Sequence, residues 1–537
     1  LQLHWLLSSA GGQSSMATKS GLTATNGEEE PFRYELGKYG MIKGSLKVTG
    51  NEELTRITWF AAFSTYAAYA FLVSMGHIRD LFSRVAGKFG MSRHFPKTRK
   101  NYAPLLRPLE NFYTRRLYHR ISDCWNRPVG SAPGAVIDVL ERCRDPRALG
   151  GMQLTGGRRR AINLGSYNYL GFGDDWNGTC ADQVLPALAR YPAGVSAARA
   201  DLGTSAAHRE LERTVARFVG KEDAVVFNMG YGTNAATVPA LVGPGCLIVS
   251  DALNHTSIVA GCRASGAKIR TFPHNDAEAL GEVLREAIAL GQPRTRRPWK
   301  KVLVMVEGIY SMEGEICDLK GIVEVCKRYK AYLYLDEAHS IGALGATGRG
   351  ACEYCGVDPA DVHVMMGTFT KSFSGMGGYI AGDRALVNHL RTRCAGPLYQ
   401  NALSPVVAQQ ILTAVRIIMG EDGTDLGRRK LEALRENCNR VRAALVRMGL
   451  HVYGNYDSPV VPVMLYNPAK IAAFSRELLR RGVAAVVVGF PATSVVLSRS
   501  RVCVSAGHTK EDLDHALQQI EEVAKLIKIR YALSPFG

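Results

Sequence analysis

Residues 362–378 read VHVMMGTFTKSFSGMGG, an apolar run that leads through small and hydroxylated residues to a lysine and then to three glycines. The apolar run is typical of a buried strand, and the glycines let the backbone approach a bound molecule closely. Partial removal from water lowers the pKa of a lysine ammonium and favours the free amine that forms a Schiff base. A glycine-flanked lysine taken alone is more often an exposed loop residue. Lys371 is therefore a candidate Schiff-base lysine, and the residues around it must show whether it is reactive or an ordinary loop residue.

A second strand-like run lies upstream of this stretch. Residues 332–340 read YLYLDEAHS, so Asp336 and His339 follow an apolar run directly. Open α/β sheets bind ligands beyond the carboxyl ends of their strands. An aspartate for a protonated pyridine nitrogen and a lysine for an aldehyde are the groups that a pyridoxal phosphate site requires. An isolated DEAH is more often a helix start, with aspartate as N-cap. The two strand ends together favour the cofactor site.

Strand-like runs and helical stretches alternate from about residue 150 onward. This spacing predicts a mainly parallel sheet with helices on both faces, an α/β fold. A long helix then leads into a smaller C-terminal α+β unit. The predicted strands are 224–227, 247–249, 268–272, 302–306, 332–335, 362–366, 379–381, 460–465 and 484–488, and the predicted helices include 278–289, 319–329, 405–419 and 510–527.

The composition limits the kinds of molecule that the protein is expected to bind. The chain has 537 residues, a net charge of +18 and a pI of about 9.4. Such a charge fits nucleic acid, an anionic membrane surface or anionic substrates, but no zinc-finger, RNA-binding or basic-zipper pattern is present, so nucleic acid is the weakest choice. The twelve cysteines are scattered, which is typical of reduced core thiols. Cys352 and Cys355 have C-x-x-C spacing without a second pair, so we expect no metal.

The N-terminal region has a different character. Residues 1–30 are polar after a short apolar start and lack a basic leader, so we expect disorder, with Met16 as a possible start. Residues 57–76 carry no charge, which suits a bilayer span, a helix lying in the membrane interface, or a buried soluble helix. The basic stretch 79–101 suits an anionic leaflet or a solvated connector. We divide the chain into a disordered segment (1–50), a membrane-associated helix (51–90), a basic connector and N-terminal arm (91–150), a large cofactor-binding domain (151–395) and a small C-terminal domain (396–537).

Five stretches resemble one family of pyridoxal phosphate enzymes. They are SDALNH (250–255), VEGIYSMEG (306–314), YLDEAHS (334–340), GTFTK (367–371) and VGFPAT (488–493). Together they resemble the α-oxoamine synthase family, and the likeness runs from Phe32 to Tyr531. It implies an aminotransferase-like fold of type I with a smaller C-terminal α+β domain.

The resemblance also implies roles for particular residues, carried over position by position. Lys371 is the Schiff-base lysine and the base at the substrate Cα, Asp336 contacts the ring nitrogen, His255 stacks on the ring, His339 contacts the 3-oxygen, and Gly230, Tyr231 and Thr368 lie at or near the phosphate. The turn at Gly230 also follows a predicted strand and opens a helix, whose backbone N–H groups suit a phosphate.

Three further positions match the substrate side of the family's site. Arg501 matches the arginine that binds the substrate carboxylate, for which a guanidinium is well suited. Tyr167 and Asn168 fall on the N-terminal substrate-side segment. Asn401 is a departure, because dimeric relatives carry there a threonine that reaches the partner's cofactor phosphate. It fits either a heterodimer whose partner has no competent site or tolerated drift.

The reaction implied by the resemblance is the condensation of L-serine with palmitoyl-CoA to 3-oxosphinganine, which begins sphingoid base synthesis. The implied partners are a lysine-less homologous subunit, a small membrane activator and a membrane-bound regulator. The implied location is the endoplasmic reticulum membrane, with the catalytic domain in the cytosol. The alternatives are a glycine-using acyl-CoA enzyme of the same family and a non-catalytic scaffold subunit of the same complex.

Overall fold

The computed structural model describes residues 35–36, 42–43, 59–88, 101–103, 112–114, 116–145 and 151–532. It divides into two units, Leu1–Gly44 and Ser45–Gly537. In the first unit, β1 (Glu35–Leu36) pairs antiparallel with β2 (Ile42–Lys43). The other described elements belong to the second unit. Most of the segment predicted to be disordered, and residues 89–100 of the basic stretch, lie outside the described residues.

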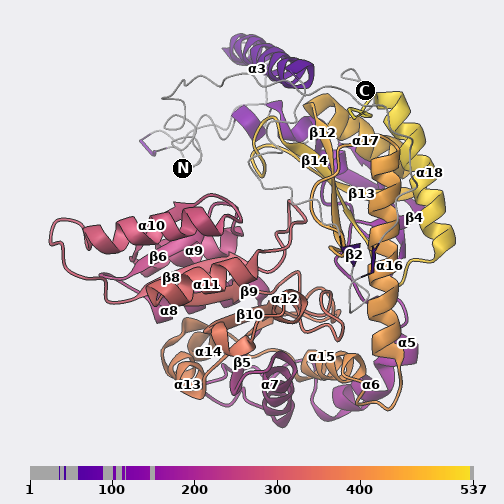
Figure 1. Ribbon diagram of the computed structural model, residues 1–537. Coiled ribbons are helices and arrows are strands. Elements are labelled where there is room, and N and C mark those ends of the chain that lie inside the picture. The colour runs from indigo at the N-terminus through magenta and orange to yellow at the C-terminus, as the bar shows by residue number, and fades with distance from the viewer. Residues whose placement is uncertain are drawn as a thin grey trace. The chain divides into compact units, whose positions relative to one another are not determined.

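A seven-stranded sheet is formed by strands between residues 223 and 382 (Figure 1). Its strand order is β5-β11-β10-β9-β8-β6-β7, and only β11 runs antiparallel to its neighbours. The predicted, mainly parallel sheet is thus confirmed, with every predicted strand of this region present. The strands are β5 (Asp223–Phe227), β6 (Leu247–Asp251), β7 (Lys268–Phe272), β8 (Val302–Glu307), β9 (Tyr332–Asp336), β10 (Val364–Thr368) and β11 (Gly378–Gly382).

Helices cover both faces of this sheet because successive strand residues point to opposite sides. Val304 and Leu333 pack into one hydrophobic cluster, whereas their neighbours Leu303 and Tyr334 pack into another. The first cluster includes residues of α7 (Ala206–Val219), α10 (Ala277–Leu290), α11 (Leu319–Tyr329) and α15 (Pro405–Ile418), and the second includes residues of α8 (Gly230–Leu241), α9 (Thr256–Ser265) and α13 (Arg384–Arg393). Shorter helices are α5 (Trp176–Thr179), α6 (Ala181–Arg190), α12 (Ala351–Cys355), α14 (Ala395–Tyr399) and η2 (Pro359–Asp361).

The helix α11 shows how local signals set these boundaries. Asp318 is its N-cap and accepts a hydrogen bond from the backbone of Gly321, which satisfies a donor left free at the helix start. Lys330 ends the helix in a left-handed conformation. Leu319, Ile322 and Cys326 are buried on one face. Residues 319–329 were predicted from this period, and the observed bounds are the same.

A second, five-stranded sheet has the order β12-β14-β13-β4-β3. Its strands are β3 (Val136–Arg144), β4 (Met152–Leu164), β12 (Val460–Tyr466), β13 (Val483–Val488) and β14 (Ser498–Cys503), and its helices are α16 (Leu426–Arg447), α17 (Pro468–Arg480) and α18 (Lys510–Ile527). This sheet departs from the expected division of the chain, because it also contains β3, which lies within the range assigned to the N-terminal arm and pairs with β4. The strand β4 lies within the range assigned to the large domain, but it pairs with β13 of the small sheet. The two strands lie far apart in the sequence, so no local pattern indicates that they pair.

Residues 59–76 of the uncharged segment form part of one long helix, α3 (Trp59–Lys88). Ala61, Thr65, Gly76 and Asp80 are buried along one face, and Asp80 forms a buried ion pair with Arg116. The opposite face is exposed and largely apolar. No helix in the described ranges is long and apolar enough to cross a membrane. The 3-10 helix η1 (Tyr118–Cys124) follows.

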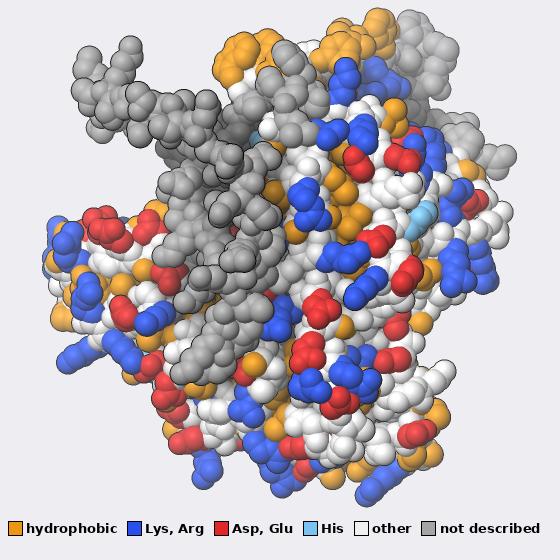
Figure 2. All heavy atoms as spheres, turned by 45° about the vertical axis from the view of Figure 1, so that its right-hand side comes forward, with side chains coloured by type: hydrophobic (Ala, Val, Ile, Leu, Met, Phe, Trp, Pro, Cys, Tyr) orange, Lys and Arg blue, Asp and Glu red, His pale blue; other side chains and the backbone are white. Residues whose placement is uncertain are grey.

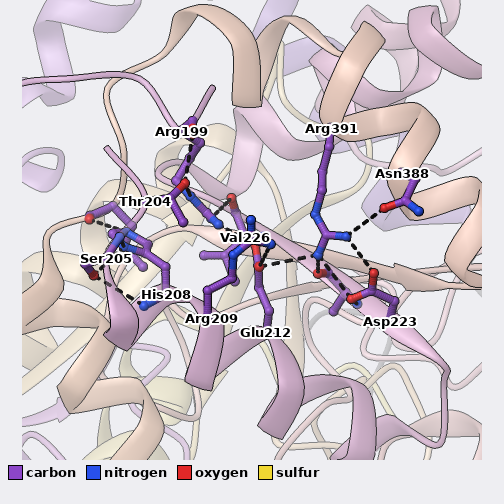
Figure 3. A network of polar contacts seen from close by, with 12 residues as sticks. Arg199, Thr204, Ser205, His208, Arg209, Glu212, Asp223, Val226, Asn388 and Arg391 are labelled. Carbon is purple, nitrogen blue, oxygen red and sulfur yellow. Dashed lines mark hydrogen bonds and ion pairs between the residues drawn. The ribbon is translucent and has the colours of Figure 1, made fainter. Parts of the chain in front are cut away.

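A network of buried charges ties β5 to the helices beside it (Figure 3). Glu212 on α7 accepts from Arg199 at 2.8 Å and lies 3.4 Å from Arg391 on α13. Arg391 also pairs with Asp223 at 2.6 Å. Each carboxylate here thus faces at least one guanidinium. His208 adds a cap at the start of α7 and contacts the carbonyl of Leu403 at 2.7 Å, so the network fixes the loop that precedes α7.

Candidate active site

The predicted cofactor residues converge on the carboxyl edge of the seven-stranded sheet. Asp336 is the last residue of β9, and the strand register places it beside Glu307 on β8 and Met366 on β10. The segment that carries Lys371 follows β10 directly. The side chains therefore meet because parallel strands end together.

Lys371 is half-buried, and its Nζ lies 5.6 Å from the centre of the Tyr167 ring. Burial lowers its pKa to about 8, and the neighbouring Asp336 and Glu307 carboxylates only partly oppose that change. Arg501 adds to the lowering. About a tenth of this amine is consequently uncharged at pH 7, far more than for an ordinary lysine, and the free amine is the form that acts as a nucleophile or base.

Asp336 is buried, and both of its carboxylate oxygens accept hydrogen bonds. Its Oδ2 accepts from Asn234 Nδ2 at 2.7 Å, and its Oδ1 accepts from the backbone N–H of Ala338 at 2.9 Å. Donors of this kind stabilise the ionised form of a carboxylate. Asp336 can therefore serve as a fixed anion for a protonated ring nitrogen.

His255 stands at the start of α9, where its ring accepts a hydrogen bond from the backbone of Ser257. Burial lowers its pKa, and Lys371 lowers it further, whereas Asp336 opposes the change. The backbone N–H of His255 donates to Glu307. Burial, with Asp336 nearby, raises the pKa of the Glu307 carboxyl well above its ordinary value. The arrangement holds a neutral imidazole near Lys371.

His339 is buried beside two tyrosines of the segment 167–169. Its Nδ1 is 2.8 Å from the Tyr169 hydroxyl, and its ring meets that of Tyr167 edge-on at 5.2 Å. Burial lowers its pKa well below the ordinary value, with Lys371 and Arg501 acting in the same direction. His339 is thus a neutral hydrogen-bonding group held in place by aromatic neighbours.

The start of α8 forms a cradle for an anionic group. No side chain caps this helix, so its first backbone N–H groups have no capping partner. A Cβ at Gly230 would lie 2.7 Å from Thr368 Oγ1, so only glycine leaves room there. Tyr231 is partly exposed, and its ring meets that of His255 edge-on at 6.2 Å. The three residues predicted to lie at the phosphate, Gly230, Tyr231 and Thr368, therefore lie together at the start of α8.

Arg501 enters the site from β14 of the small sheet. Its guanidinium carbon lies 4.6 Å from the centre of the Tyr167 ring, so Tyr167 contacts both Arg501 and Lys371. Its Nε is buried without a hydrogen-bond partner among the described residues. A buried guanidinium with an unused donor is suited to a carboxylate ligand.

Asn168 has a different setting from the other predicted substrate residues. Its Oδ1 accepts from Ser374 at 2.6 Å, and its Nδ2 donates to the carbonyl of Pro133 at 3.3 Å. These bonds tie the segment after Lys371 to the loop beside Tyr167. The substrate role of Asn168 stays a prediction.

The sequence interpretation missed two residues that hold the site together. Asn234 lies within the glycine-rich turn, but nothing in that turn shows that its amide reaches Asp336, 102 residues away. Tyr169 contacts His339 over a separation of 170 residues. Their contacts depend on the packing of distant segments, so no local pattern could have shown them.

The residues present fit pyridoxal phosphate. The start of α8 and Thr368 would hold the phosphate, Asp336 the ring nitrogen, His255 and His339 the ring and its oxygen, and Lys371 the aldehyde carbon. The unused donor of Arg501 would hold a carboxylate on the same edge. The catalytic roles of the individual residues stay predictions.

Comparison with known proteins agrees with this reading. The family model described as aminotransferase class I and II matches residues 159–520. Long chain base biosynthesis protein 2a of Arabidopsis thaliana is 54% identical over 475 residues, which cover 88% of this chain and 96% of that protein. Serine palmitoyltransferase 2 of Dictyostelium discoideum is 48% identical over 481 residues, which cover 89% and 97%.

Solved structures resemble the chain as well. A serine palmitoyltransferase of Sphingomonas wittichii superposes with a TM-score of 0.69 at 29% identity and covers 80% of this chain and all of its own. A further structure, described as serine palmitoyltransferase with its PLP internal aldimine, gives 0.68 at 27% identity over 79% of this chain.

Proposed function

Because the chain belongs to the aminotransferase class I and II family, and within it to the serine palmitoyltransferases, we propose that the edge around Lys371 is where serine is joined to an acyl chain. The protein is a pyridoxal-phosphate-dependent acyltransferase of sphingolipid synthesis. It uses L-serine and an acyl-CoA, palmitoyl-CoA in our proposal, and it acts within a multi-subunit enzyme. The observation that carries the site assignment is the meeting of Lys371, Tyr167 and Arg501 beside Asp336.

Each residue of the site has its own role in the proposed reaction. When bound, the cofactor supplies an electron sink for the charge left at the serine Cα. Asp336 keeps a proton on the ring nitrogen, Arg501 holds the serine carboxylate, and His255 stacks against the ring. Lys371, with its lowered pKa, would take up the Cα proton, which leaves that carbon able to displace CoA from the thioester. Loss of CO2 from the resulting β-keto acid, with the proton returned from Lys371 to the same carbon, would give 3-oxosphinganine.

An apolar cavity near Tyr167 supports an acyl substrate. It has a volume of about 880 Å³ and reaches Gly165 and Ser166, which directly precede Tyr167. Its apolar lining includes Tyr113, Trp125, Ile137, Val486, Val488 and Phe490. A cavity of this character suits an alkyl chain, which gains about 0.8 kcal/mol for each CH₂ removed from water.

The test of the substrate assignment is incorporation of radiolabelled amino acids by the purified holoenzyme, co-expressed with candidate partner subunits. We expect serine to be consumed with palmitoyl-CoA, with CO2 and 3-oxosphinganine as products, and shorter acyl-CoAs to react more slowly. Consumption of glycine in place of serine would overturn the assignment. Absence of a cofactor absorption band in the wild-type complex would favour the scaffold alternative.

We also propose that the specific partner is a lysine-less homologous subunit that covers the cradle of α8. Met229 and Tyr231, which flank Gly230, are exposed, as are Leu202 and Tyr399 at 93% and 80%. The backbones of Ala198 and Asn401 pair, so these exposed residues lie on adjoining segments. Replacing Leu202 and Tyr399 by aspartate should abolish co-purification with that subunit, whereas Val446→Asp, at an exposed position on α16, should not. Retained co-purification would contradict the proposed face.

The proposed location is the endoplasmic reticulum membrane, with α3 lying on its cytosolic surface. Trp59, Phe63, Phe71, Leu81 and Phe82 are exposed on this helix. Figure 2 shows hydrophobic side chains along the upper edge of the molecule, the level at which Figure 1 places α3. A helix of this kind buries its apolar side chains among lipid headgroups.

Vesicle flotation tests the proposed membrane contact. Phe63→Glu with Phe71→Glu should reduce binding to phosphatidylcholine vesicles that contain anionic phospholipid, and Leu526→Glu on α18 should leave it unchanged. Equal binding of both variants would argue against α3 as the contact. By resemblance alone we also propose a small membrane activator and a membrane-bound regulator, which co-expression and activity measurements can test.

A further inference from the structure

Asn234 is a buried amide that is hydrogen-bonded directly to Asp336 and is linked to His255 through Ser257. It lies on α8, within the segment that opens with the phosphate cradle. Its Nδ2 donates to Asp336 Oδ2 at 2.7 Å and to Ser257 Oγ at 3.0 Å. Its Oδ1 accepts from the Tyr334 hydroxyl at 2.7 Å. The sequence interpretation gave this residue no role, and the mechanism above does not use it.

The direction of each hydrogen bond around Asn234 is determined by its neighbours. Tyr334 is fully buried, and burial raises its pKa well above the ordinary value, so its hydroxyl keeps its proton and donates. The amide oxygen must therefore face Tyr334, which turns both N–H groups of the amide toward Asp336 and Ser257. A flipped amide would set two acceptors, its own oxygen and the Asp336 carboxylate, against each other.

The chain of bonds continues from Ser257 to His255. The backbone N–H of Ser257 points to His255 Nδ1 at 3.3 Å, so that nitrogen is an acceptor. Ser257 Oγ lies 2.7 Å from the same nitrogen, and because that nitrogen is an acceptor, the hydroxyl donates its proton to Nδ1 while its oxygen accepts from Asn234. The imidazole proton is then left on Nε2.

We propose that Asn234 is a positioning residue that orients two groups of the cofactor site, Asp336 directly and His255 through Ser257. Through Asp336 it keeps an anionic acceptor aimed at the ring nitrogen, and through Ser257 it holds His255 as the neutral tautomer with hydrogen on Nε2. The inference rests on the proposed function, because a cofactor ring between these two residues gives the arrangement its purpose. Asn234 itself would contact neither the cofactor ring nor the substrate, because its hydrogen bonds go to Asp336, Ser257 and Tyr334.

The test separates the two branches with three variants. Asn234→Leu removes both branches, Ser257→Ala removes only the branch to His255, and Thr237→Val is a buried, nearly isosteric control further along α8. The first readout is the dissociation constant of pyridoxal phosphate for the apo-complex, measured by fluorescence quenching. The second is the tautomer of His255, measured by NMR of ¹⁵N-histidine-labelled apo-protein and assigned with His255→Asn.

We expect Asn234→Leu to weaken pyridoxal phosphate binding by about 10- to 100-fold, the effect of losing one hydrogen bond to a charged group. Ser257→Ala should weaken it less than tenfold, but it should raise the population of the His255 tautomer protonated on Nδ1, because that nitrogen then keeps only the 3.3 Å contact with the backbone N–H of residue 257. Thr237→Val should change neither readout. Thermal unfolding of each variant shows whether the fold survives, and Ser257→Ala serves if Asn234→Leu does not fold.

Two outcomes would overturn the inference while leaving the proposed function intact. One is wild-type affinity in Asn234→Leu, and the other is an unchanged His255 tautomer in Ser257→Ala. Failure of the wild-type complex itself to bind pyridoxal phosphate would instead overturn the proposed function.

Discussion

Two buried polar clusters of this protein lie at the same sheet but differ in how their charges are matched. In the network around Glu212 and Asp223, each carboxylate faces at least one guanidinium, and the group fastens helices to β5 (Figure 3). In the site around Lys371, burial lowers the pKa of the lysine to about 8, and Arg501 forms no ion pair with a carboxylate among the described residues.

The difference teaches which cluster is structural and which is chemical. A buried ion pair is satisfied by its own partner and has little left to offer a ligand. A group with a strongly shifted pKa at a strand end gains from a ligand that completes it. Mutation should consequently damage stability in the first cluster and chemistry in the second.

The largest effect is expected at the reactive lysine. Lys371→Ala should lower turnover by about 10³-fold or more, because the variant loses both the covalent anchor and the base. The absorption band of the lysine-bound cofactor should disappear, whereas the melting temperature of the apo-protein should change little. Substantial turnover in this variant would remove Lys371 from the mechanism.

The structural cluster should respond in the opposite way. Glu212→Gln removes the buried anion that pairs with Arg199, whereas Arg391 keeps its pair with Asp223, and breaking a buried pair costs about 3–5 kcal/mol in the free energy of unfolding. Urea unfolding measures this change, and cofactor absorbance per folded molecule should stay constant. Arg440→Ala, which breaks an exposed pair with Asp514, is the matched control and should cost under about 1 kcal/mol. If both variants lost the same free energy of unfolding, the cluster around Glu212 would not be the structural cluster that we infer.

A smaller effect is expected where the site meets the substrate. Arg501→Lys keeps the positive charge but loses the planar guanidinium, so the KM for serine should rise by about 10- to 100-fold, with less change in kcat. Steady-state kinetics with palmitoyl-CoA held at saturation gives both constants. A fall in kcat alone would assign Arg501 to the chemical step rather than to carboxylate binding.

The pH dependence of cofactor capture sharpens the comparison further. A lysine whose pKa is lowered from 10.5 to about 8 gains its free amine as pH rises toward 8. The rate at which the apo-complex captures pyridoxal phosphate should rise about tenfold per pH unit below 8 and level off above it. Stopped-flow absorbance measures this rate. A rate still rising steeply above pH 9 would indicate an ordinary lysine.

The particular elements show what could be predicted. The strand before Lys371 and the helix 319–329 were predicted because apolar spacing and capping residues act over a few neighbours. The strands β3 and β4 were missed, and so was β14, which carries Arg501. These strands are polar over part of their length, and β4 pairs with a strand from the far end of the chain. Pairing over such a distance leaves no local pattern.

The sequence by itself determined the chemistry that the site can perform: a lysine and an aspartate at neighbouring strand ends, a glycine-rich helix start and motifs shared with one family. Local steric and hydrophobic rules are enough to place such residues at the edge of a parallel sheet. Only the tertiary structure decided how they are held. The lowered pKa of Lys371, the pairing of Tyr167 with Arg501 and the orientation of Asn234 all arise from burial and from contacts between distant segments, which exist only once the chain is packed.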